Sequence, residues 1–339
     1  MRARELGLAC GALPPGVRNT IADVPGVLVG HRTLADGAVH TGVTAILPHD
    51  GDLFQSKPLA AAHVTNGFGK SMGLVQLGEL GTLETPILLT NTFAVGACAT
   101  ALIRRAIAAD PEIGRRTATV NPVVLECNDG YLNDIQAMAV TEADAADAIE
   151  AAAEDFALGA VGAGTGMSCF GFKGGIGSAS RRLRLDGTSY HLGVLVLANF
   201  GRAGDLRLPD GRRVDPDGPA MAEHGSCIVV VATDIPLGCR QLGRVVRRTG
   251  AGLAWCGSFW GNGSGDIALA FTTAGLVAQE PDGDFHYLRI LTEGRIDRLF
   301  QATAEATQEA VLDALAAAAT TEGRNGHVRV GLAEVLRPG

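Results

Sequence analysis

The 339-residue sequence predicts a single α/β domain. Short apolar runs bounded by turn-forming residues are typical of buried strands, and they alternate with longer Ala-rich stretches of helical periodicity. We find no internal repeat and no second hydrophobic pattern that would separate one part of the chain from another. A chain of this length can bury one large core, so residues 1–339 are expected to form one domain with several core strands.

Strands and helices follow one another through the first half of the chain. The apolar runs expected to be strands are 26–30, 42–47, 86–90 and 119–127. Residues 93–109 are Ala-rich, with Arg104 and Arg105 on one side, which predicts a helix. A capping-box pattern at Thr141 and Asp144 predicts the beginning of a second helix, which we expect to continue to about residue 158.

The second half begins with a Gly-rich stretch, 159–180, and then an apolar strand, 191–198. Residues 201–225 are polar and rich in turn formers, which predicts an exposed loop. This loop ends abruptly at residues 226–233, whose continuous apolar pattern is typical of a strand buried on both faces. Three further elements are expected after it: a helix at 237–248, a strand at 266–272 and a long helix from about residue 297.

Composition and charge argue against several classes of function. The formal net charge is −8, whereas a nucleic-acid-binding domain is expected to carry clustered basic residues. The strongest basic cluster, Arg240, Arg244, Arg247 and Arg248, has the spacing of the solvent-exposed side of one helix. On this evidence we do not expect a nucleic acid as partner. The first residues lack the apolar region of a signal peptide and no long apolar run occurs, so we do not expect a membrane as partner either.

The seven cysteines are spread along the chain without a C-x-x-C pair. An odd, dispersed set is typical of reduced thiols and not of a disulfide framework or a zinc site, so we expect a cytoplasmic protein. The eight histidines are also dispersed and no H-E-x-x-H occurs. Neither a metal nor a cofactor is therefore expected.

Two nucleotide-binding patterns are incomplete, and the nucleophile elbow of many serine hydrolases is missing. Lys70-Ser71 resembles the end of a P-loop, but Val64 takes the place of its first glycine. The glycines from Gly162 to Gly166 follow a helix, and Met167 takes the third glycine position of a dinucleotide-binding loop. No G-x-S-x-G surrounds any serine. A conventional triad, a kinase and a zinc hydrolase therefore have no support.

Ser226 lies directly after Gly225, between the polar loop and the apolar strand. An ordinary Gly-Ser turn that begins a strand explains this pattern, and so does a site of self-cleavage. In the second interpretation, glycine hinders little and the Ser226 hydroxyl attacks the carbonyl before it. Hydrolysis of the ester would make Ser226 a new N-terminus, whose α-amine, with a reference pKa of about 7.7–8.0, can act as base for its own hydroxyl.

Ser264 and Asp266 lead into the strand expected at 266–272. Residues i and i+2 of an extended chain point to the same side, so these two side chains can share one face. There, Ser264 could hydrogen-bond the nucleophile and Asp266 could hold the charge of the active amine. An ordinary Gly/Asn/Asp turn is the alternative interpretation.

Polar residues at the ends of two other expected strands complete the candidate site. Asn199 follows the strand at 191–198, and its side-chain amide could stabilise an oxyanion. Glu126 ends another strand, where its carboxylate could bind a substrate ammonium. Asn128 and Tyr131 follow it closely and are further candidates for substrate binding. A turn-forming asparagine and a polar strand-to-loop junction are the alternatives here.

Together these segments resemble the family of self-processing aminopeptidases that includes the L-aminopeptidase/D-Ala-esterase-amidase enzymes and the β-peptidyl aminopeptidases. The likeness runs over nearly the whole chain, in the blocks 18–31, 64–70, 86–92, 126–134 and 174–178. It implies cleavage between Gly225 and Ser226. Ser264 and Asp266 match the second serine and the acidic residue of the family, although some members carry Glu at the latter position. Asn199 resembles its oxyanion-hole asparagine and Glu126 its amine-binding glutamate, whereas Asn128 replaces an aromatic residue.

The resemblance implies a four-layer αββα sandwich that looks like an N-terminal nucleophile hydrolase but is differently connected. It also implies processed chains, 1–225 and 226–339, that stay together as αβ units in homo-oligomers. Its substrates would be short peptides, amides or esters that begin with Gly, Ala, D-Ala or a β-amino acid.

Two other enzymes and one function without catalysis remain as alternatives. An endo-amidase of nylon-type oligomers and an ornithine acetyltransferase of similar fold usually carry threonine at the cleavage site, in contrast to Ser226. A non-catalytic binding protein on the same scaffold would remain unprocessed.

Overall fold

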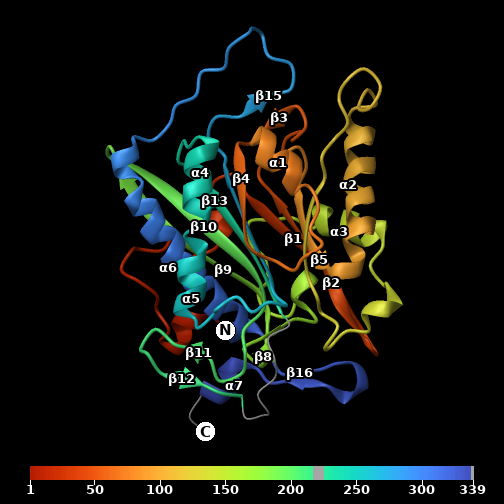
Figure 1. Ribbon diagram of the computed structural model, residues 1–339, viewed down its shortest axis with the longest axis vertical. Helices are drawn as coiled ribbons and strands as arrows, with labels where there is room; N and C mark the ends of the chain where they lie inside the picture. The colour runs from red at the N-terminus through yellow and green to blue at the C-terminus, as the bar shows by residue number, and fades with distance from the viewer. Residues whose placement is uncertain (217–224, 337–339) are drawn as a thin grey trace.

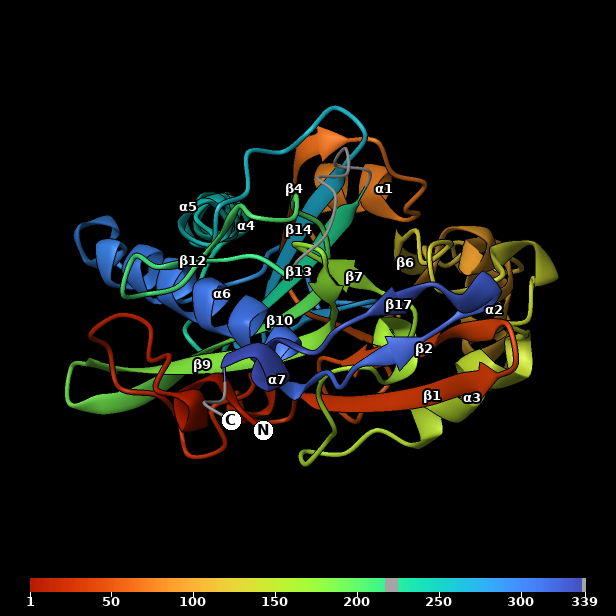
Figure 2. The ribbon, with the colours of Figure 1, turned by 90° about the horizontal axis from the view of Figure 1, so that it is seen from below.

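The structure is a computed structural model that describes residues 1–216 and 225–336. Two β-sheets pack face to face and helices cover the outer face of each, which makes four layers in the order helix, sheet, sheet, helix (Figures 1 and 2). The αββα sandwich implied by the family resemblance is therefore confirmed. Strands buried on both faces suit this arrangement, because each sheet lies between a helix layer and the other sheet.

The first sheet has four strands in the order β1, β2, β5, β6. Their bounds are β1 Leu28–Asp36, β2 Val39–Leu47, β5 Ile87–Asn91 and β6 Val123–Cys127. Helices α2 (Val95–Ala109) and α3 (Glu142–Glu150) cover its outer face, against apolar side chains of β2, β5 and β6. The four strands and two helices expected in this half are present, although β1 continues to Asp36, beyond its expected end at residue 30, and α3 ends earlier than expected.

Helix α3 begins as the capping box predicts but ends earlier than expected. The Thr141 backbone N–H donates to the Asp144 carboxylate at 2.9 Å, which caps the first turn. After Glu150 the chain leaves the helix and pairs with β1: Val29 and Ala153 exchange two backbone hydrogen bonds of 3.0 Å each. The expected continuation to about residue 158 is therefore wrong, because this Ala-rich segment satisfies its backbone groups against a strand.

The second sheet has five strands in the order β4, β14, β13, β10, β9. Their bounds are β4 Ala60–Gly67, β14 Gly265–Thr272, β13 Ser226–Thr233, β10 Thr188–Asn199 and β9 Gly175–Leu185. Only β13 and β14 run parallel to each other; the other neighbours are antiparallel. Helices α4 (Cys239–Val246), α5 (Thr249–Trp255) and α6 (Asp297–Ala317) cover its outer face.

Strand β9 begins inside the stretch that the sequence marks only as Gly-rich. Its glycines lower strand propensity, which conceals the strand from pattern analysis. One of them has a packing role: a methyl group on Gly177 would lie 1.8 Å from the carbonyl oxygen of Ala310 in α6. Helix α6 can therefore approach the sheet closely only because residue 177 has no side chain.

The helix expected at 237–248 is divided into α4 and α5, with a break at Arg247 and Arg248. The basic cluster in this region is partly paired instead of merely solvated. Arg240 and Arg244 both form ion pairs with Glu293. The guanidinium groups of Arg244 and Arg248 lie over the ring of Phe300, the latter at 3.7 Å.

The segment expected as an exposed loop, 201–225, is partly buried where the structure describes it. It contains a short hairpin of β11 (Leu206–Arg207) and β12 (Arg213–Val214). Leu206 and Leu208 join the core beneath this hairpin. Residues 217–224 lie outside the described part of the chain.

Smaller elements connect these layers. They are β3 Ser56–Lys57, β7 Ser168–Cys169, β8 Phe172–Lys173, β15 Val277–Ala278, β16 Thr321–Glu322, β17 Val328–Arg329, α1 Leu74–Leu80 and α7 Leu332–Leu336. One segment, Thr92–Ala109, is long and apolar enough to cross a membrane by length and composition alone. In this fold it contains α2, which packs one face against the first sheet.

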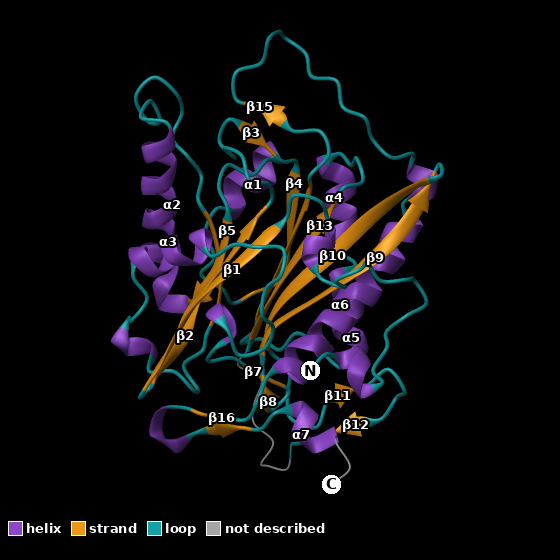
Figure 3. Ribbon diagram, turned by 180° about the vertical axis from the view of Figure 1, so that it is seen from behind, coloured by secondary structure: helices purple, strands orange, loops and turns teal. Residues whose placement is uncertain are grey.

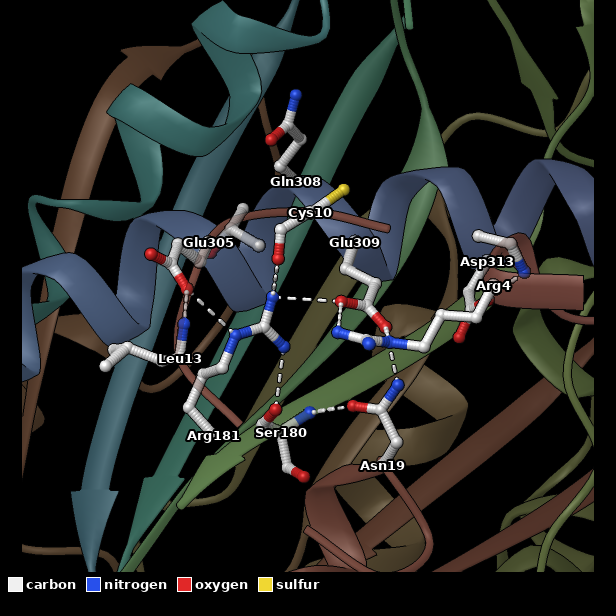
Figure 4. A network of polar contacts seen from close by, with 12 residues as sticks. Arg4, Cys10, Leu13, Asn19, Ser180, Arg181, Glu305, Gln308, Glu309 and Asp313 are labelled. Carbon is white, nitrogen blue, oxygen red and sulfur yellow. Dashed lines mark hydrogen bonds and ion pairs between the residues drawn. The ribbon is translucent and has the colours of Figure 1, made fainter. Parts of the chain in front are cut away.

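Three carboxylates of helix α6 contact the N-terminal segment of the chain: Glu305, Glu309 and Asp313 (Figure 4). The fully buried guanidinium of Arg181 bonds Glu305 at 3.2 Å and Glu309 at 2.9 Å, and it also donates to two backbone carbonyls. Arg4 binds Glu309 as well. The apolar periodicity predicts this helix but gives no sign of its acidic, buried contact with the N-terminal segment.

All seven cysteines are free thiols; six are buried and Cys239 is partly exposed. Burial raises the pKa of Cys10 and of Cys98 to about 12. These thiols are therefore protonated near neutral pH and lack the reactivity of a thiolate.

Candidate active site

Three neighbouring strands of the second sheet bring the predicted catalytic residues to one end of that sheet, and Glu126 lies on β6 of the first sheet. Ser226 is the first residue of β13, and Asn199 is the last residue of the adjacent β10. In the strand register, Ser226 pairs with Asn199 on one side and with Gly265 of β14 on the other. The short strands β7 and β8 lie beside this end (Figure 3).

The Ser226 hydroxyl is held in place by the adjacent strand. Its Oγ accepts a hydrogen bond from the Gly265 backbone N–H at 3.1 Å, and the residue is 4% exposed. A methyl group on Gly265 would lie 3.1 Å from this Oγ and 2.6 Å from the Phe68 carbonyl oxygen. Glycine at position 265 therefore gives the hydroxyl both its donor and its space.

Ser264 and Asp266 flank the residue that faces Ser226. The Ser264 hydroxyl is buried and makes no hydrogen bond within the described residues. Leaving a buried hydroxyl without a hydrogen bond costs about 1–3 kcal/mol, so this position of Ser264 calls for an explanation. Asp266 is buried and pairs with Cys227, one position beyond Ser226. Burial, together with the charge of Asp266, raises the pKa of the Cys227 thiol.

Asn199 has a side chain whose orientation is set by two backbone groups. Its Oδ1 accepts from the Ser168 N–H at 2.9 Å, and its Nδ2 donates to the Asn128 carbonyl at 2.9 Å. A donor at one end and an acceptor at the other determine which end of the amide is nitrogen. Within the described residues, this nitrogen makes one hydrogen bond and has a second hydrogen.

The Glu126 carboxylate is buried and oriented by two donors from other segments. Its Oε1 accepts from the Lys70 N–H at 2.8 Å, and its Oε2 accepts from the Thr92 hydroxyl. Gly69 lies between this carboxylate and β14. A methyl group on Gly69 would lie 3.6 Å from Glu126 Oε1 and 3.9 Å from the Gly265 Cα. Gly69 thus lies between the Glu126 carboxylate and Gly265, the residue that contacts the Ser226 hydroxyl.

The other two predicted substrate-binding residues have different surroundings. Asn128 is exposed, and its carbonyl belongs to the site because it accepts from Asn199. The Tyr131 ring is stacked on His327 at 4.5 Å, with the Arg329 guanidinium 3.7 Å from its centre. The structure therefore brings Asn128 to Asn199 and directs Tyr131 toward the C-terminal segment.

Several residues that shape the site were missed by sequence analysis. Ser168 contributes a backbone N–H, which no side-chain pattern can indicate. Thr92 and Lys70 lie within blocks that carry the family resemblance, but their contact with Glu126 needs the fold. Gly69 and Gly265 are visible in the sequence only as glycines of turn-like segments.

Comparisons with known proteins show the family of the chain. Residues 19–329 match the model of peptidase family S58. The chain is 39% identical to the beta-peptidyl aminopeptidase of Sphingosinicella microcystinivorans, over 96% of this chain and 88% of that protein.

Two solved structures superpose closely on the fold. One is the crystal structure of a Pyrococcus horikoshii protein, with a TM-score of 0.94, 48% identity and coverage of 99% of this chain and 98% of that one. The other is the L-aminopeptidase D-Ala-esterase/amidase of Ochrobactrum anthropi, with a TM-score of 0.88, 34% identity and coverage of 98% and 95%. The latter is described as a variant of the Ntn hydrolase fold. On this evidence the chain belongs to peptidase family S58, and it is a hydrolase with aminopeptidase activity.

Proposed function

We propose that the chain cleaves itself between Gly225 and Ser226 and then uses Ser226 as the nucleophile of an aminopeptidase. The observation that carries this proposal is the position of the Ser226 hydroxyl. The residue is buried at the end of its strand, where it pairs with Asn199, and the hydroxyl lies 3.1 Å from the Gly265 N–H; Gly69 separates Gly265 from the Glu126 carboxylate.

In the self-cleavage step, Ser226 Oγ attacks the Gly225 carbonyl carbon. The peptide C–N bond breaks, the nitrogen takes the hydroxyl proton, and an ester joins Gly225 to Ser226. Water hydrolyses this ester, which leaves a carboxylate on residue 225 and a free α-amine on residue 226. With a reference pKa of about 7.7–8.0, this amine is partly unprotonated near neutral pH and can act as general base.

In turnover, Ser226 attacks the carbonyl of the first residue of the substrate and forms an acyl-enzyme, which water hydrolyses. The α-amine takes the hydroxyl proton and gives it to the leaving amine. The free N–H of Asn199 stabilises the oxyanion, and the Glu126 carboxylate pairs with the substrate ammonium. The buried, unpaired hydroxyl of Ser264 is a hydrogen-bond partner for the nucleophile, and the negative charge of Asp266 favours the protonated α-amine.

The surroundings of Gly225 support a particular class of substrates. A methyl group with L configuration on Gly225 would lie 2.0 Å from the Asn199 carbonyl oxygen and 2.6 Å from the Phe200 Cα. Gly225 is the first acyl group that Ser226 attacks, so later acyl groups are expected to occupy similar space. Glycyl and β-aminoacyl groups carry a CH₂ next to the carbonyl, and a D-alanyl methyl points the other way. We expect these to be preferred over L-alanyl groups.

The proposal includes assembly and location. After cleavage, β13 and β14 would remain between β4 and β10 of the other fragment, so that hydrogen bonds on both sides hold the αβ unit together. Seven free thiols suit a reducing cytoplasm. Phe285 and Tyr287, 80% and 96% exposed on the segment before α6, support association of αβ units into a homo-oligomer.

The test combines intact mass with turnover of aminoacyl p-nitroanilides. The wild-type chain is expected to separate into fragments 1–225 and 226–339 and to hydrolyse glycyl, β-alanyl and D-alanyl substrates faster than L-alanyl ones. Ser226→Ala should remain full-length and inactive, because it lacks the attacking oxygen. Ser189→Ala, an exposed serine of β10, is the matched control and should behave as wild type.

An active Ser226→Ala protein would remove this serine from its role. A wild-type chain that never splits and hydrolyses nothing would support the non-catalytic binding protein. Acetyl transfer from acetylornithine, or cleavage only within nylon-type oligomers, would support the two rival enzymes.

A further inference from the structure

Lys173 is a fully buried cation that the proposed reaction does not use. It lies in β8, next to the Phe170-Gly171 turn that joins β8 to β7. Its Nζ donates to three backbone carbonyls, those of Gly164 and Met167 at 3.0 Å each and that of Gly174 at 2.9 Å. An ammonium group has three hydrogens, so these carbonyls satisfy all of its donors.

The three carbonyls belong to one loop, and this loop carries the donor that orients Asn199. Ser168 lies within it and pairs with Lys173 in the β7–β8 register. The Ser168 N–H in turn donates to Asn199 Oδ1 at 2.9 Å. Lys173 is therefore paired with Ser168, and Ser168 is hydrogen-bonded to Asn199, the side chain proposed to hold the oxyanion.

The other end of the Asn199 amide is connected to the same buried region. Its Nδ2 donates to the Asn128 carbonyl, and the next residue is Asp129, which is fully buried and accepts from Asn133 at 2.9 Å. The loop tied by Lys173 passes directly against Asp129, because a methyl group on Gly166 would lie 2.9 Å from the Asp129 Cβ. The backbone groups that bind the two ends of the Asn199 amide thus belong to segments that contain Asp129 and the carbonyls bound by Lys173.

The pKa values of Lys173 and Asp129 reflect the burial of both side chains and the charge that each exerts on the other. Burial lowers the pKa of Lys173 to about 7, and the negative charge of Asp129 opposes this change. Burial also raises the pKa of Asp129 to about 6, against the hydrogen bonds of Thr41 and Asn133 and, to a smaller extent, the charge of Lys173. A buried charge is costly unless it is paired and hydrogen-bonded. Here the Lys173 ammonium is hydrogen-bonded to three backbone carbonyls of the loop.

We propose that Lys173 is a positioning residue of the active site, which holds the loop of Ser168 so that the Asn199 amide points its free N–H at the oxyanion. This inference rests on the proposed function, because it assigns Lys173 a role in both self-cleavage and turnover. It acts through Asn199 and touches no reacting atom.

The test is a double-mutant cycle on the full chain, with the rate of self-cleavage followed by intact mass. Asn199→Ala removes the oxyanion donor and should slow cleavage about 100- to 1,000-fold. Lys173→Met keeps the length of the side chain without its donors, and a displaced oxyanion donor should slow cleavage about 10- to 100-fold. Combined with Asn199→Ala, it should cause less than about twofold further slowing, because the residue through which it acts is gone.

Two comparisons separate positioning from general destabilisation. Arg181→Met removes another fully buried cation, which binds Glu305 and Glu309 of α6. This variant should unfold at a lower temperature without slower self-cleavage. Lys173→Met combined with Ser264→Ala should slow cleavage by the product of the single effects. In the cleaved protein, Lys173→Met should lower kcat and leave KM unchanged.

Should Lys173→Met fail to fold, Lys173→Gln takes its place: it keeps two N–H donors, so cleavage should be slowed less but with the same dependence on Asn199. The inference is overturned if Lys173 and Asn199 variants slow cleavage independently, or if Lys173 variants raise KM alone. A wild-type chain that does not cleave itself would instead overturn the proposed function, and this inference with it.

Discussion

At the scale of single residues, the candidate site contains Ser226, Asn199 and Glu126, which have different contacts. Ser226 and Asn199 are paired in the strand register, whereas the buried Glu126 carboxylate is separated from Gly265 by Gly69. The residue types of all three could be predicted from the sequence, because each is polar at the end of an apolar run. Their donors could not, since Ser168, Gly265 and Lys70 all contribute backbone N–H groups.

Glu126→Gln is expected to distinguish turnover from self-cleavage. The Gly225-Ser226 bond lies within the chain and has no free ammonium beside it, so self-cleavage should keep its wild-type rate. Aminopeptidase turnover loses a charged hydrogen bond to the substrate ammonium, and KM should rise about 10- to 100-fold.

The measurement is steady-state kinetics on a glycyl p-nitroanilide beside timed intact mass. Glu84→Gln is the control, because Glu84 is also buried and paired, with Lys57 at 2.8 Å. A variant of Glu126 with unchanged KM would assign the ammonium to another group.

At the scale of elements, the fully buried strands and the helices α2 and α6 were predicted well, whereas β4 and the Gly-rich β9 were not expected as strands. The strand at β13 was predicted over its full length, because eight consecutive buried residues leave no other pattern. Strand β9 was missed, since its glycines serve the contact with α6 and weaken the strand signal. Helix α3 was predicted too long, because Ala-rich sequence favours a helix until a tertiary backbone contact competes with it.

Gly177→Ala is expected to push α6 away from the second sheet. The added methyl would meet backbone atoms of Ala310 and Ala314 at 1.8 and 2.5 Å, which cannot move aside like a flexible side chain. The free energy of unfolding should fall by about 1–3 kcal/mol or more. Chemical denaturation measures this change.

Gly96→Ala in α2 is the matched control for that experiment. A methyl group there meets no atom within 4 Å, and alanine favours a helix, so stability should rise by about 0.5–1 kcal/mol. Equal effects of the two substitutions would contradict the close contact of α6 and β9.

At the scale of the whole molecule, a network of ion pairs joins the two fragments that cleavage would create. All three carboxylates of the network lie on α6, in residues 226–339, and the arginines that bind them lie in residues 1–225 (Figure 4). The interleaved strands of the second sheet also come from both fragments. Cleavage would therefore cut the chain without opening the core.

Arg181→Met is expected to destabilise the whole fold. It leaves Glu305 and Glu309 buried with fewer partners, and the loss of one side of a buried ion pair costs about 3–5 kcal/mol. The midpoint of urea unfolding should fall accordingly. Arg213→Met, at an exposed position of β12, should change it little, and equal midpoints for both variants would show that the network contributes nothing.

The sequence by itself determined the alternation of strands and helices, the buried strand after Gly225 and the polar residues at the strand ends. It could do so because periodicity, capping residues and turn formers act locally along the chain. Only the tertiary structure decided which strands are neighbours, and therefore that Ser226 faces Asn199 and Gly265. It also decided the role of the buried charges, because a lysine or an acidic helix face looks solvent-exposed in the sequence until the packing of distant segments surrounds it.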